Sequence, residues 1–311
     1  MAVSGSESRA EPSASSLASF TELLMPCLDA VEAASLVEVG AFQGEFTRDL
    51  LAWADSRGAH VTAIDPEPRP ELTELSDAHG GLQLVREPSL SVLGELPPAD
   101  ALFIDGDHNY FTVLGELRLI AERAQAAAMP FIALHDVCWP HARRDTYYVP
   151  ERIPESHRQQ LAHDVRLAPG VVGAAQTGLH FDWAAEREGG SRNGVLTAVE
   201  DFMDEIRGLR FALIPVFFGL GVLWPEDASW SGTVANLLEP WDRSPILARL
   251  EAARLAQMSD RIKLDHQEAV LRSLLNSRAF AVAEGVSKLR QGGDPAFSRE
   301  QVRRVLGDEP D

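Results

Sequence analysis

Residues 35–44 read SLVEVGAFQG, and this stretch decides the fold that we expect for the chain. Its first half is an apolar run typical of a buried strand, and Gly40 and Gly44 bracket the turn that follows. Residues 45–54, EFTRDLLAWA, then repeat apolar side chains at helical spacing. A strand, a glycine turn and a helix N-terminus together make a place for a ligand, because glycine permits close backbone approach and free N–H groups face the crevice.

A second strand supports this interpretation. Residues 60–65, HVTAID, end in Asp65, at roughly the distance beyond the glycines where a carboxylate binds ribose hydroxyls in nucleotide-binding folds. The glycine pair alone is weak evidence, since an ordinary turn between a strand and a helix has the same pattern. The two stretches together favour a ligand site at the carboxyl ends of parallel strands.

Strands and helices alternate through the first half of the chain. Apolar runs predict strands at 35–40, 60–65, 82–87, 101–105 and 130–135. Helical patterns fall at 16–33, 45–56, 70–78, 89–95 and 112–126. Such alternation indicates βαβ units and a doubly wound parallel sheet, with the carboxyl ends of the strands at one edge.

The second half of the chain departs from this rhythm. Residues 138–193 are rich in Pro, Arg and aromatic side chains, so we expect an irregular lid or substrate-binding insertion. A helix at 194–206 is followed by apolar runs at 211–218 and 221–225, separated only by Gly219-Leu220. So short a link permits only an antiparallel hairpin. The expected fold class is therefore α/β, with a mostly parallel seven-stranded sheet that ends in an antiparallel hairpin.

Charged helical sequence follows. Apolar residues between 245 and 290 make an interrupted stripe that fits a helical hairpin, a short coiled coil or a helix folded back on its own domain. We favour a subunit contact, and hence a homo-oligomer. The expected division is a disordered leader at 1–15, a main domain of 16–137 and 194–240, the insertion at 138–193 and a C-terminal helical segment at 241–311.

The composition excludes some classes of partner. A formal net charge of −19 disfavours nucleic acid and anionic membranes, because phosphate binding needs concentrated Lys and Arg. No stretch is apolar enough to span a bilayer, and no secretory signal is visible. The two cysteines, Cys27 and Cys138, make neither a disulfide framework nor a zinc cluster. These features predict a cytoplasmic protein.

Titratable residues gather at the ends of two predicted strands. The fourth strand runs into FIDGDHNY and the fifth into ALHDVCW. Asp105, His135 and Asp136 can make a site for Mg²⁺, Ca²⁺ or Mn²⁺, and the imidazole favours Mn²⁺ or another transition metal. Alternatively, His108 or His135 is a general base oriented by a carboxylate, or both histidines are only structural. Asp107 fits either this cluster or a cap on the next helix.

The order EVGAFQG, AID, FIDGDHNY, ALHDV and a terminal hairpin resembles the class I S-adenosylmethionine-dependent methyltransferases. Among these the chain is most similar to small-molecule O-methyltransferases of antibiotic and sugar pathways, including metal-dependent macrolide-sugar and catechol-type enzymes. The resemblance covers residues 16–137 and 194–225. It does not extend to the insertion or to the C-terminal helices.

The resemblance implies a role for particular positions. It places the methionine half of the cofactor at Glu38, Gly40, Phe42 and Gly44, the ribose at Asp65, and the adenine near Glu87 and Ser89. It implies that Asp105, His135 and Asp136 stand where catechol-type enzymes hold magnesium, and that His108 stands where those enzymes have a catalytic lysine. His135 departs from the family pattern, because it replaces an oxygen ligand.

The resemblance and the polar cluster predict methyl transfer to a hydroxyl of a sugar, a cyclitol or another secondary metabolite, with catalysis by His108, Asp105 and Asp136. From the insertion, Arg143, Arg144, Tyr147 and Tyr148 are candidates for acceptor recognition, or else residues of a solvated loop. Four alternatives remain: a metal-free carboxyl O-methyltransferase, a non-catalytic assembly partner, a metal-dependent hydrolase, and an NAD-dependent oxidoreductase, which would need a third glycine.

Overall fold

A computed structural model describes residues 16–124, 129–291 and 298–308. The expected leader at 1–15 lies outside the described residues. The seven strands of the main sheet lie in the order β3-β2-β1-β4-β5-β9-β8. The first five are parallel, and β9 runs antiparallel to both β5 and β8. The expected fold class is therefore confirmed.

The strands of this sheet are β1 (Ser35–Val39), β2 (His60–Ile64), β3 (Leu82–Val85), β4 (Ala101–Ile104), β5 (Phe131–His135), β8 (Leu209–Ile214) and β9 (Leu220–Pro225). Their side chains alternate between two apolar cores, as the pleat of a strand requires. Leu36 and Phe103 face the core under α1, α2 and α7, whereas Val37 and Leu102 face the core under α4, α5 and α6. Helices on both faces bury the sheet and leave its carboxyl edge for a site.

The helices are η1 (Leu17–Phe20), α1 (Thr21–Val31), α2 (Glu45–Asp55), α3 (Pro70–Ala78), α4 (Ser89–Val92), α5 (Tyr110–Ala124), α6 (Val195–Glu205) and α7 (Ser231–Leu238). The helix predicted at 112–126 begins two residues earlier, at Tyr110. Asn109 caps it, because its side-chain oxygen accepts a hydrogen bond from the Thr112 amide at 2.9 Å. The predicted end at 126 lies outside the described residues.

The terminal hairpin is antiparallel as predicted, but the predicted strand bounds were wrong. The strands β8 and β9 are joined by residues 215–219, a longer link than Gly219-Leu220, and Leu220 already belongs to β9. Pro215 ends β8 because it has no amide to donate to the ladder. Phe217 and Phe218, which the apolar pattern assigned to a strand, both have positive φ angles, of 52° and 65°.

The insertion is more ordered than an irregular loop. It contains 3-10 turns η2 (Pro150–Arg152) and η3 (Glu155–His157) and an antiparallel ribbon of β6 (Leu161–Leu167) and β7 (Leu179–Ala185). Arg152 reaches across to Glu67 beyond β2, with a 2.8 Å contact between their side chains. The insertion therefore spans from the end of β5 to the end of β2 along the carboxyl edge.

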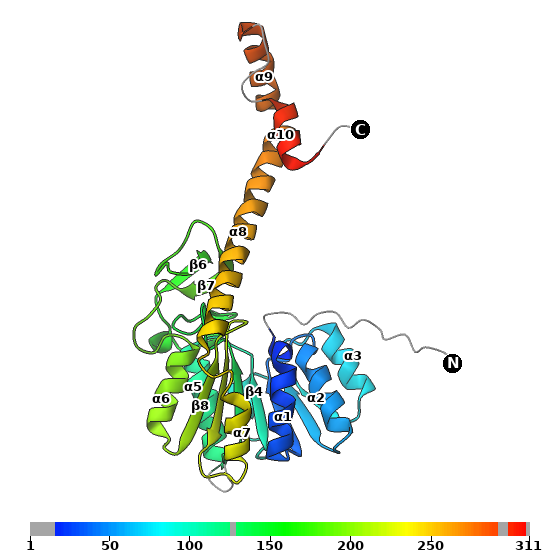
Figure 1. Cartoon of the computed structure of the whole chain (residues 1–311), viewed down its shortest axis with the longest axis vertical. Coiled ribbons are helices and arrows are strands. Elements are labelled where there is room, and N and C mark those ends of the chain that lie inside the picture. The colour runs from blue at the N-terminus through cyan, green and yellow to red at the C-terminus, as the bar shows by residue number, and fades with distance from the viewer. Residues whose placement is uncertain (1–15, 125–128, 292–297, 309–311) are drawn as a thin grey trace, which may run out of the picture.

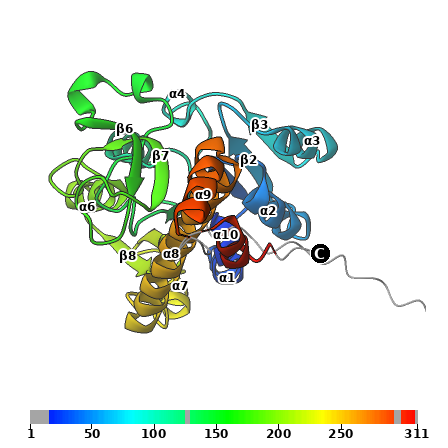
Figure 2. The same ribbon diagram turned by 90° about the horizontal axis from the view of Figure 1, so that it is seen from above.

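Beyond the sheet, the chain forms α8 (Pro245–Asn276), α9 (Arg278–Gln291) and α10 (Arg299–Leu306). The 32-residue α8 begins beside the carboxyl edge and projects away from the domain (Figure 1). The view from above shows α8 and α9 rising over this edge, with α10 beside them (Figure 2). Val302 of α10 is buried, and Arg272 of α8 pairs with Asp308 at 2.9 Å. None of the helices in the described part of the chain combines the length and apolar character of a bilayer span.

Candidate active site

Four segments that are far apart in the sequence meet at the carboxyl edge of the sheet. Backbone hydrogen bonds join Gly40 to Ile64 at 2.8 Å and Asp105 to Val39 at 2.9 Å. Gly40 has a φ of +84°, and a Cβ atom on it would overlap the backbone of Asp105 and Gly106. Only glycine fits where these two turns touch. The glycine turn and the polar cluster thus share one wall.

Asp65 is built into the glycine turn. One of its carboxylate oxygens accepts a hydrogen bond from the Phe42 amide at 2.7 Å, and the other accepts one from the Glu67 amide at 2.8 Å. Each oxygen keeps a further lone pair for a ligand hydroxyl. Phe42 itself is exposed, with the Arg69 guanidinium 5.0 Å from its ring centroid. The side chain of Asp65 therefore fixes the turn and can still accept a hydrogen bond from a ligand.

Glu38 lies buried at the end of β1, beneath the same turn. Its carboxylate accepts a hydrogen bond from the Thr47 hydroxyl at 2.6 Å. Burial raises the pKa of Glu38 to about 8, the Thr47 hydrogen bond opposes this shift, and the charges of Asp105, Asp65 and Asp49 add to it. Glu38 therefore carries a proton at neutral pH in the ligand-free protein.

The residues after β3 differ in exposure. Glu87 is exposed, whereas Ser89 is buried and donates a hydrogen bond from its hydroxyl to Glu116 of α5. Glu116 is fully buried, and its second carboxyl oxygen has no partner. Burial raises the pKa of Glu116 to about 8, with the Ser89 hydrogen bond opposing it. Ser89 thus joins α4 to α5 at the place where the resemblance puts the adenine.

His135 lies between two carboxylates. Its Nδ1 is 3.2 Å from an oxygen of Asp105 and 3.2 Å from an oxygen of Asp136, and its Nε2 donates to the Phe217 carbonyl at 2.8 Å. Burial lowers the pKa of His135, but the two carboxylates override that effect and raise it well above its usual value. The two carboxylates therefore favour the protonated imidazolium form of His135.

Two further histidines surround Asp136. His108 Nδ1 lies 3.2 Å from Asp136 Oδ2, and His141 Nε2 lies 3.7 Å from Asp136 Oδ1. The His108 and His141 rings are 4.5 Å apart between centroids. The other nitrogen of His108 is 3.2 Å from the Tyr148 hydroxyl, and that of His141 is 3.0 Å from the Thr146 hydroxyl. His108 therefore has a close partner at each nitrogen, whereas His141 has one at Nδ1 only among the described residues.

The electrostatics centre on Asp136, which is buried and has a φ of 63°. Burial alone would raise its pKa, but His135, His108 and His141 hold the pKa of Asp136 well below its usual range. By contrast, burial raises the pKa of Asp105, with His135 opposing it. Burial lowers the pKa of His141 to about 3, so this ring is neutral at pH 7. Two triads, Asp105–His135–Asp136 and His108–Asp136–His141, have the spacing of metal ligands.

Asp107 does not cap α5, since Asn109 does so. Its carboxylate instead accepts a hydrogen bond from the Thr112 hydroxyl at 3.2 Å, and burial raises its pKa. At the other side of the site, the Leu17 amide of η1 donates to Asp105 at 3.3 Å. The N-terminal turn and the start of α5 therefore both border the cluster.

Of the four acceptor candidates from the insertion, Tyr148 is the one that contacts the cluster. Arg143 pairs with Glu200 of α6 at 2.6 Å. Arg144 is fully buried and donates to insertion carbonyls, including that of Ala185 at 2.9 Å. The Tyr147 hydroxyl donates to Asp145 at 2.9 Å. These contacts of Arg143, Arg144 and Tyr147 organise the insertion.

Sequence reasoning missed three contributors: His141, the Phe217 carbonyl and the Leu17 amide. His141 lies in the insertion segment WPHARR, and only its proximity to HDV at 135–137 could have drawn attention to it. The other two are backbone groups, for which side-chain patterns carry no signal.

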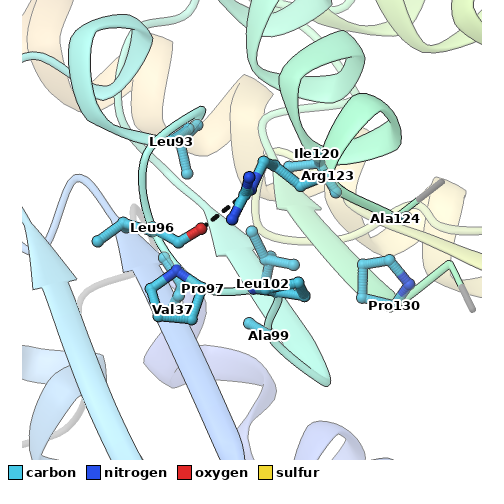
Figure 3. A pocket seen from close by; sticks show the side chains of 11 residues that line it. Val37, Leu93, Leu96, Pro97, Ala99, Leu102, Ile120, Arg123, Ala124 and Pro130 are labelled. Carbon is cyan, nitrogen blue, oxygen red and sulfur yellow. Dashed lines mark hydrogen bonds between the residues drawn. The ribbon is translucent and has the colours of Figure 1, made fainter. Parts of the chain in front are cut away.

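An apolar pocket occurs elsewhere, between the sheet and α5, and is shown in Figure 3. Val37, Leu102, Ile120 and Pro130 line it, and Arg123 Nε donates to the Leu96 carbonyl at 3.1 Å beside it. Ala99 and Pro130 precede β4 and β5, so the pocket lies toward the amino ends of the strands. It shares no residue with the polar cluster.

Comparison with known proteins finds similarity to methyltransferases. Residues 37–137 match a family model described as a methyltransferase domain. No curated protein sequence matches the chain. Similar solved structures include SAH-bound methyltransferase PaMTH1 from Podospora anserina, at 15% identity over 71% of this chain and 91% of that chain, with a TM-score of 0.41. Another is cofactor-bound Rv0187 from MTB, at 16% identity over 69% and 87% of the two chains, with a TM-score of 0.40.

Proposed function

We propose that this chain, of which residues 37–137 match a methyltransferase domain, is a class I S-adenosylmethionine-dependent methyltransferase that transfers a methyl group to a hydroxyl oxygen of a small molecule. The observation that carries the proposal is the position of Asp136 among three histidines, on the wall shared with the glycine turn. A hydroxyl gains from losing its proton, whereas a carboxylate acceptor is already ionised at neutral pH. A cluster of histidines and carboxylates therefore fits a hydroxyl better.

The residues of the glycine turn fit the cofactor. The carboxylates of Asp65 and Asp105 suit ribose hydroxyls and a cationic sulfonium, and the buried, protonated Glu38 can donate a hydrogen bond to the cofactor. When bound, S-adenosylmethionine supplies a methyl group on an already activated sulfur. We assign its methionine half to Glu38, Gly40, Phe42 and Gly44, its ribose to Asp65 and its adenine to the neighbourhood of Glu87 and Ser89. The protein then mainly has to align the acceptor with the methyl group.

We assign His108 as the general base. Asp136 holds its Nδ1, so the Nε2 atom points toward the Tyr148 hydroxyl and can accept a proton there. An acceptor hydroxyl in the place of the Tyr148 hydroxyl would pass its proton to Nε2, and Asp136 would stabilise the resulting imidazolium. Asp105 contributes through His135, which it shares with Asp136. From His108 the proton returns to solvent.

The triad of Asp105, His135 and Asp136 also fits a divalent cation such as Mn²⁺. Its donor set is two carboxylates and one imidazole, and the Phe217 carbonyl accepts from the far nitrogen of His135, as the outer partners of metal-bound histidines do. When bound, such an ion would lower the pKa of a coordinated hydroxyl. The chemistry assigned to His108 does not depend on it.

The acceptor would enter beneath the insertion. Tyr148 is 70% exposed and lies over the cluster, so it is our main candidate for acceptor contact. A polyhydroxylated acceptor, such as a sugar or cyclitol from secondary metabolism, suits the hydrogen-bonding groups of His108, Tyr148 and Asp107. Arg143, Arg144 and Tyr147 would then support the insertion that carries Tyr148.

We further propose that the chain is a homo-oligomer through its C-terminal helices. Ile246, Leu250 and Leu264 of α8 are exposed by 69%, 58% and 60%. At 3.6 residues per turn, these three positions fall along one line of the helix. A second copy carrying the same line would offer a self-complementary partner.

A methyl-transfer assay tests the function. The full chain is incubated with methyl-labelled S-adenosylmethionine and a panel of sugars, cyclitols and carboxylic acids, and calorimetry measures cofactor binding separately. We expect label on a hydroxyl compound, and a loss of about a hundredfold or more in kcat for His108→Ala, because a positioned base contributes about 10² to 10⁴.

The matched control is His266→Ala, on the exposed surface of α8, which should keep full turnover. Label found only on carboxylic acids would contradict the proposed hydroxyl acceptor. Cofactor binding without transfer to any acceptor would leave the family assignment intact and favour a non-catalytic partner.

A further inference from the structure

The loop between β8 and β9, residues 215–219, lies directly on the segment that carries Asp136. The Phe217 carbonyl accepts from His135 Nε2 at 2.8 Å. The Phe218 carbonyl accepts from the Cys138 amide at 2.7 Å, and the Gly219 carbonyl accepts from the Val137 amide at 3.4 Å. Three successive carbonyls of this loop therefore fix the ring of His135 and the backbone that follows Asp136.

The loop holds this position in an unfavourable backbone conformation. Phe217 and Phe218 are consecutive left-handed residues, although neither is glycine. Gly219 follows with a φ of +95°, and a Cβ atom on it would collide with Cys138. Bulky residues adopt left-handed angles only where surrounding contacts impose them. The contacts that impose this conformation therefore also fix the position of His135.

These contacts come from the root of the projecting helix α8. Glu251 is buried, and its two carboxylate oxygens accept from the amides of Phe217 and Phe218 at 3.0 Å each. Arg254, one turn further along α8, pairs with both oxygens of Glu251 at 2.7 Å. Its guanidinium lies 4.5 Å from the Phe218 ring centroid. A charged pair thus clamps the two strained residues from the side opposite the cluster.

Aromatic packing also joins the loop at 215–219 to His135. The ring of Phe20 makes edge contacts with both His135 and Phe217, each with 6.0 Å between centroids. If the loop relaxed, both the carbonyl partner and the packing partner of His135 would move. Asp136, which His135 contacts at 3.2 Å, would lose part of its support.

We infer that Glu251 is a positioning residue for methyl transfer: with Arg254 it holds Phe217 and Phe218 so that the Phe217 carbonyl orients His135 toward Asp105 and Asp136. This inference rests on the proposed function for its effect on turnover, but its structural part does not. It also means that the projecting helix α8 is mechanically joined to the active site. Whatever binds α8 can therefore alter the cluster through Glu251.

Spectroscopy on Glu251→Gln tests the structural part. In protein labelled with ¹⁵N at histidine, we expect His135 to show a protonated Nε2 that is protected from solvent exchange, with assignment by His135→Asn. In Glu251→Gln this signal should shift and lose its protection. The matched control, Glu268→Gln, removes an exposed ion pair with Arg272 on the same helix and should leave the signal unchanged.

Kinetics tests the functional part. We expect kcat of Glu251→Gln to fall by about tenfold, the lower end of the effect of losing an outer partner of a site residue. The Kd for S-adenosylhomocysteine should change by less than about twofold, since the glycine turn is untouched. Glu251→Asp, which keeps the charge, should recover part of the loss.

A folded Glu251→Gln protein with an unchanged His135 signal would overturn the inference, whatever its activity. A changed signal with unchanged kcat would overturn the role in turnover. If Glu251→Gln does not fold, Arg254→Gln replaces it, and an unchanged His135 signal there overturns the inference equally. Because the spectroscopic experiment needs no acceptor, its result is independent of whether the proposed reaction is correct.

Discussion

At the scale of single residues, Gly40 determines whether the glycine turn and the cluster can meet. Its backbone has a φ of +84° and touches the backbone of Asp105 and Gly106. For Gly40→Ala we expect a loss of stability well above the roughly 1–2 kcal/mol that a left-handed alanine costs by itself, because the overlap forces two turns apart. S-adenosylhomocysteine binding should weaken by at least about tenfold.

Gly58→Ala is the control for this prediction. Gly58 also has a positive φ, of +68°, but open space surrounds the position of a Cβ atom. The Gly58→Ala protein should therefore lose only the roughly 1–2 kcal/mol that a left-handed alanine costs. Its cofactor binding should not change. Urea unfolding and calorimetry measure the two quantities. Equal losses in both variants would mean that the close contact of Gly40 is unimportant.

The buried carboxyl group of Glu116 should make the stability of the protein depend on pH. Its pKa in the folded protein is raised by burial to about 8, from 4.5. A group with a raised folded pKa contributes stability that is present at pH values below 4.5 and lost as the pH rises toward 8. Within this window the free energy of unfolding should fall by about 1.4 kcal/mol per pH unit for this group.

Glu116→Gln removes the titrating proton and should make the dependence of stability on pH between 5 and 8 less steep. The part of this dependence that comes from Glu38, whose pKa is raised to a similar value, should remain. Urea unfolding at several pH values measures the slopes. Glu226→Gln, at an exposed position, should leave the slope as in the wild type. A parallel pair of curves for the wild type and Glu116→Gln would contradict the prediction.

Part of the site could be predicted from single residues. Asp105, His135 and Asp136 follow buried strands, and parallel strands bring such residues to one edge, so their convergence required only the strand assignments. His141 could not be found in this way, because its position depends on the path of the insertion. The contact of Phe217 with His135 is made by a backbone carbonyl, which every residue has, so the sequence could not single it out.

At the scale of elements, Asp145 ties the insertion to the sheet domain. Its buried carboxylate accepts from the amides of Tyr110 and Gly194 at 2.7 Å each and from the Tyr147 hydroxyl at 2.9 Å. For Asp145→Asn we expect a loss of about 1–3 kcal/mol, because an amide cannot accept all three hydrogen bonds at both ends. Limited proteolysis should show faster cleavage between residues 150 and 190.

Asp182→Asn, on the exposed surface of β7, is the matched control and should be cleaved at the wild-type rate. Cofactor binding should be unchanged in both variants, since neither residue touches the glycine turn. An Asp145→Asn protein with wild-type cleavage would mean that the insertion is held by its other contacts, such as the Arg144 hydrogen bonds.

Element types were easier to predict than element ends. Parallel strands buried on both faces read as continuous apolar runs, and each of the five expected ones is present. The β8–β9 hairpin was misplaced because Val216, Phe217 and Phe218 are as apolar as strand residues, yet they line the site and α8. The β6–β7 ribbon was missed because glycine and proline dominate the sequence around it, and short alternating runs within it gave too weak a pattern.

At the scale of the whole molecule, the amphipathic pattern of the last seventy residues did not distinguish a hairpin, a coiled coil or a helix packed on its own domain. The structure combines a helix packed on its own domain with a second helix that lies against it. The root of α8 packs on the domain through Glu251 and Leu255, and α10 lies against its far half with Val302 buried. On the same helix, Leu250 and Leu264 stay exposed, and tertiary contacts of this kind cannot be derived from periodicity alone.

The exposed line of Ile246, Leu250 and Leu264 on α8 is the surface through which we expect two chains to associate. We expect the full chain to be a dimer by light scattering, and Leu250→Glu with Leu264→Glu to shift it to monomer. Burying one leucine contributes about 1.5–3 kcal/mol, and the symmetric contact would lose it twice per position, so the dimer Kd should rise by at least a hundredfold.

Ser273→Glu is the control, because position 273 faces the opposite side of α8 from position 264 and is exposed. It adds the same charge and should leave the dimer intact. Helix content and S-adenosylhomocysteine binding should be equal in all variants, which separates a lost contact from a lost fold. A wild-type chain that stays monomeric at high concentration would contradict the proposed dimer, and a double variant that remains dimeric would move the contact to another surface. If dimerisation does depend on α8, the clamp at Glu251 predicts that turnover per chain rises or falls with dilution across the dimer Kd, because the partner and the active site then act on the same helix.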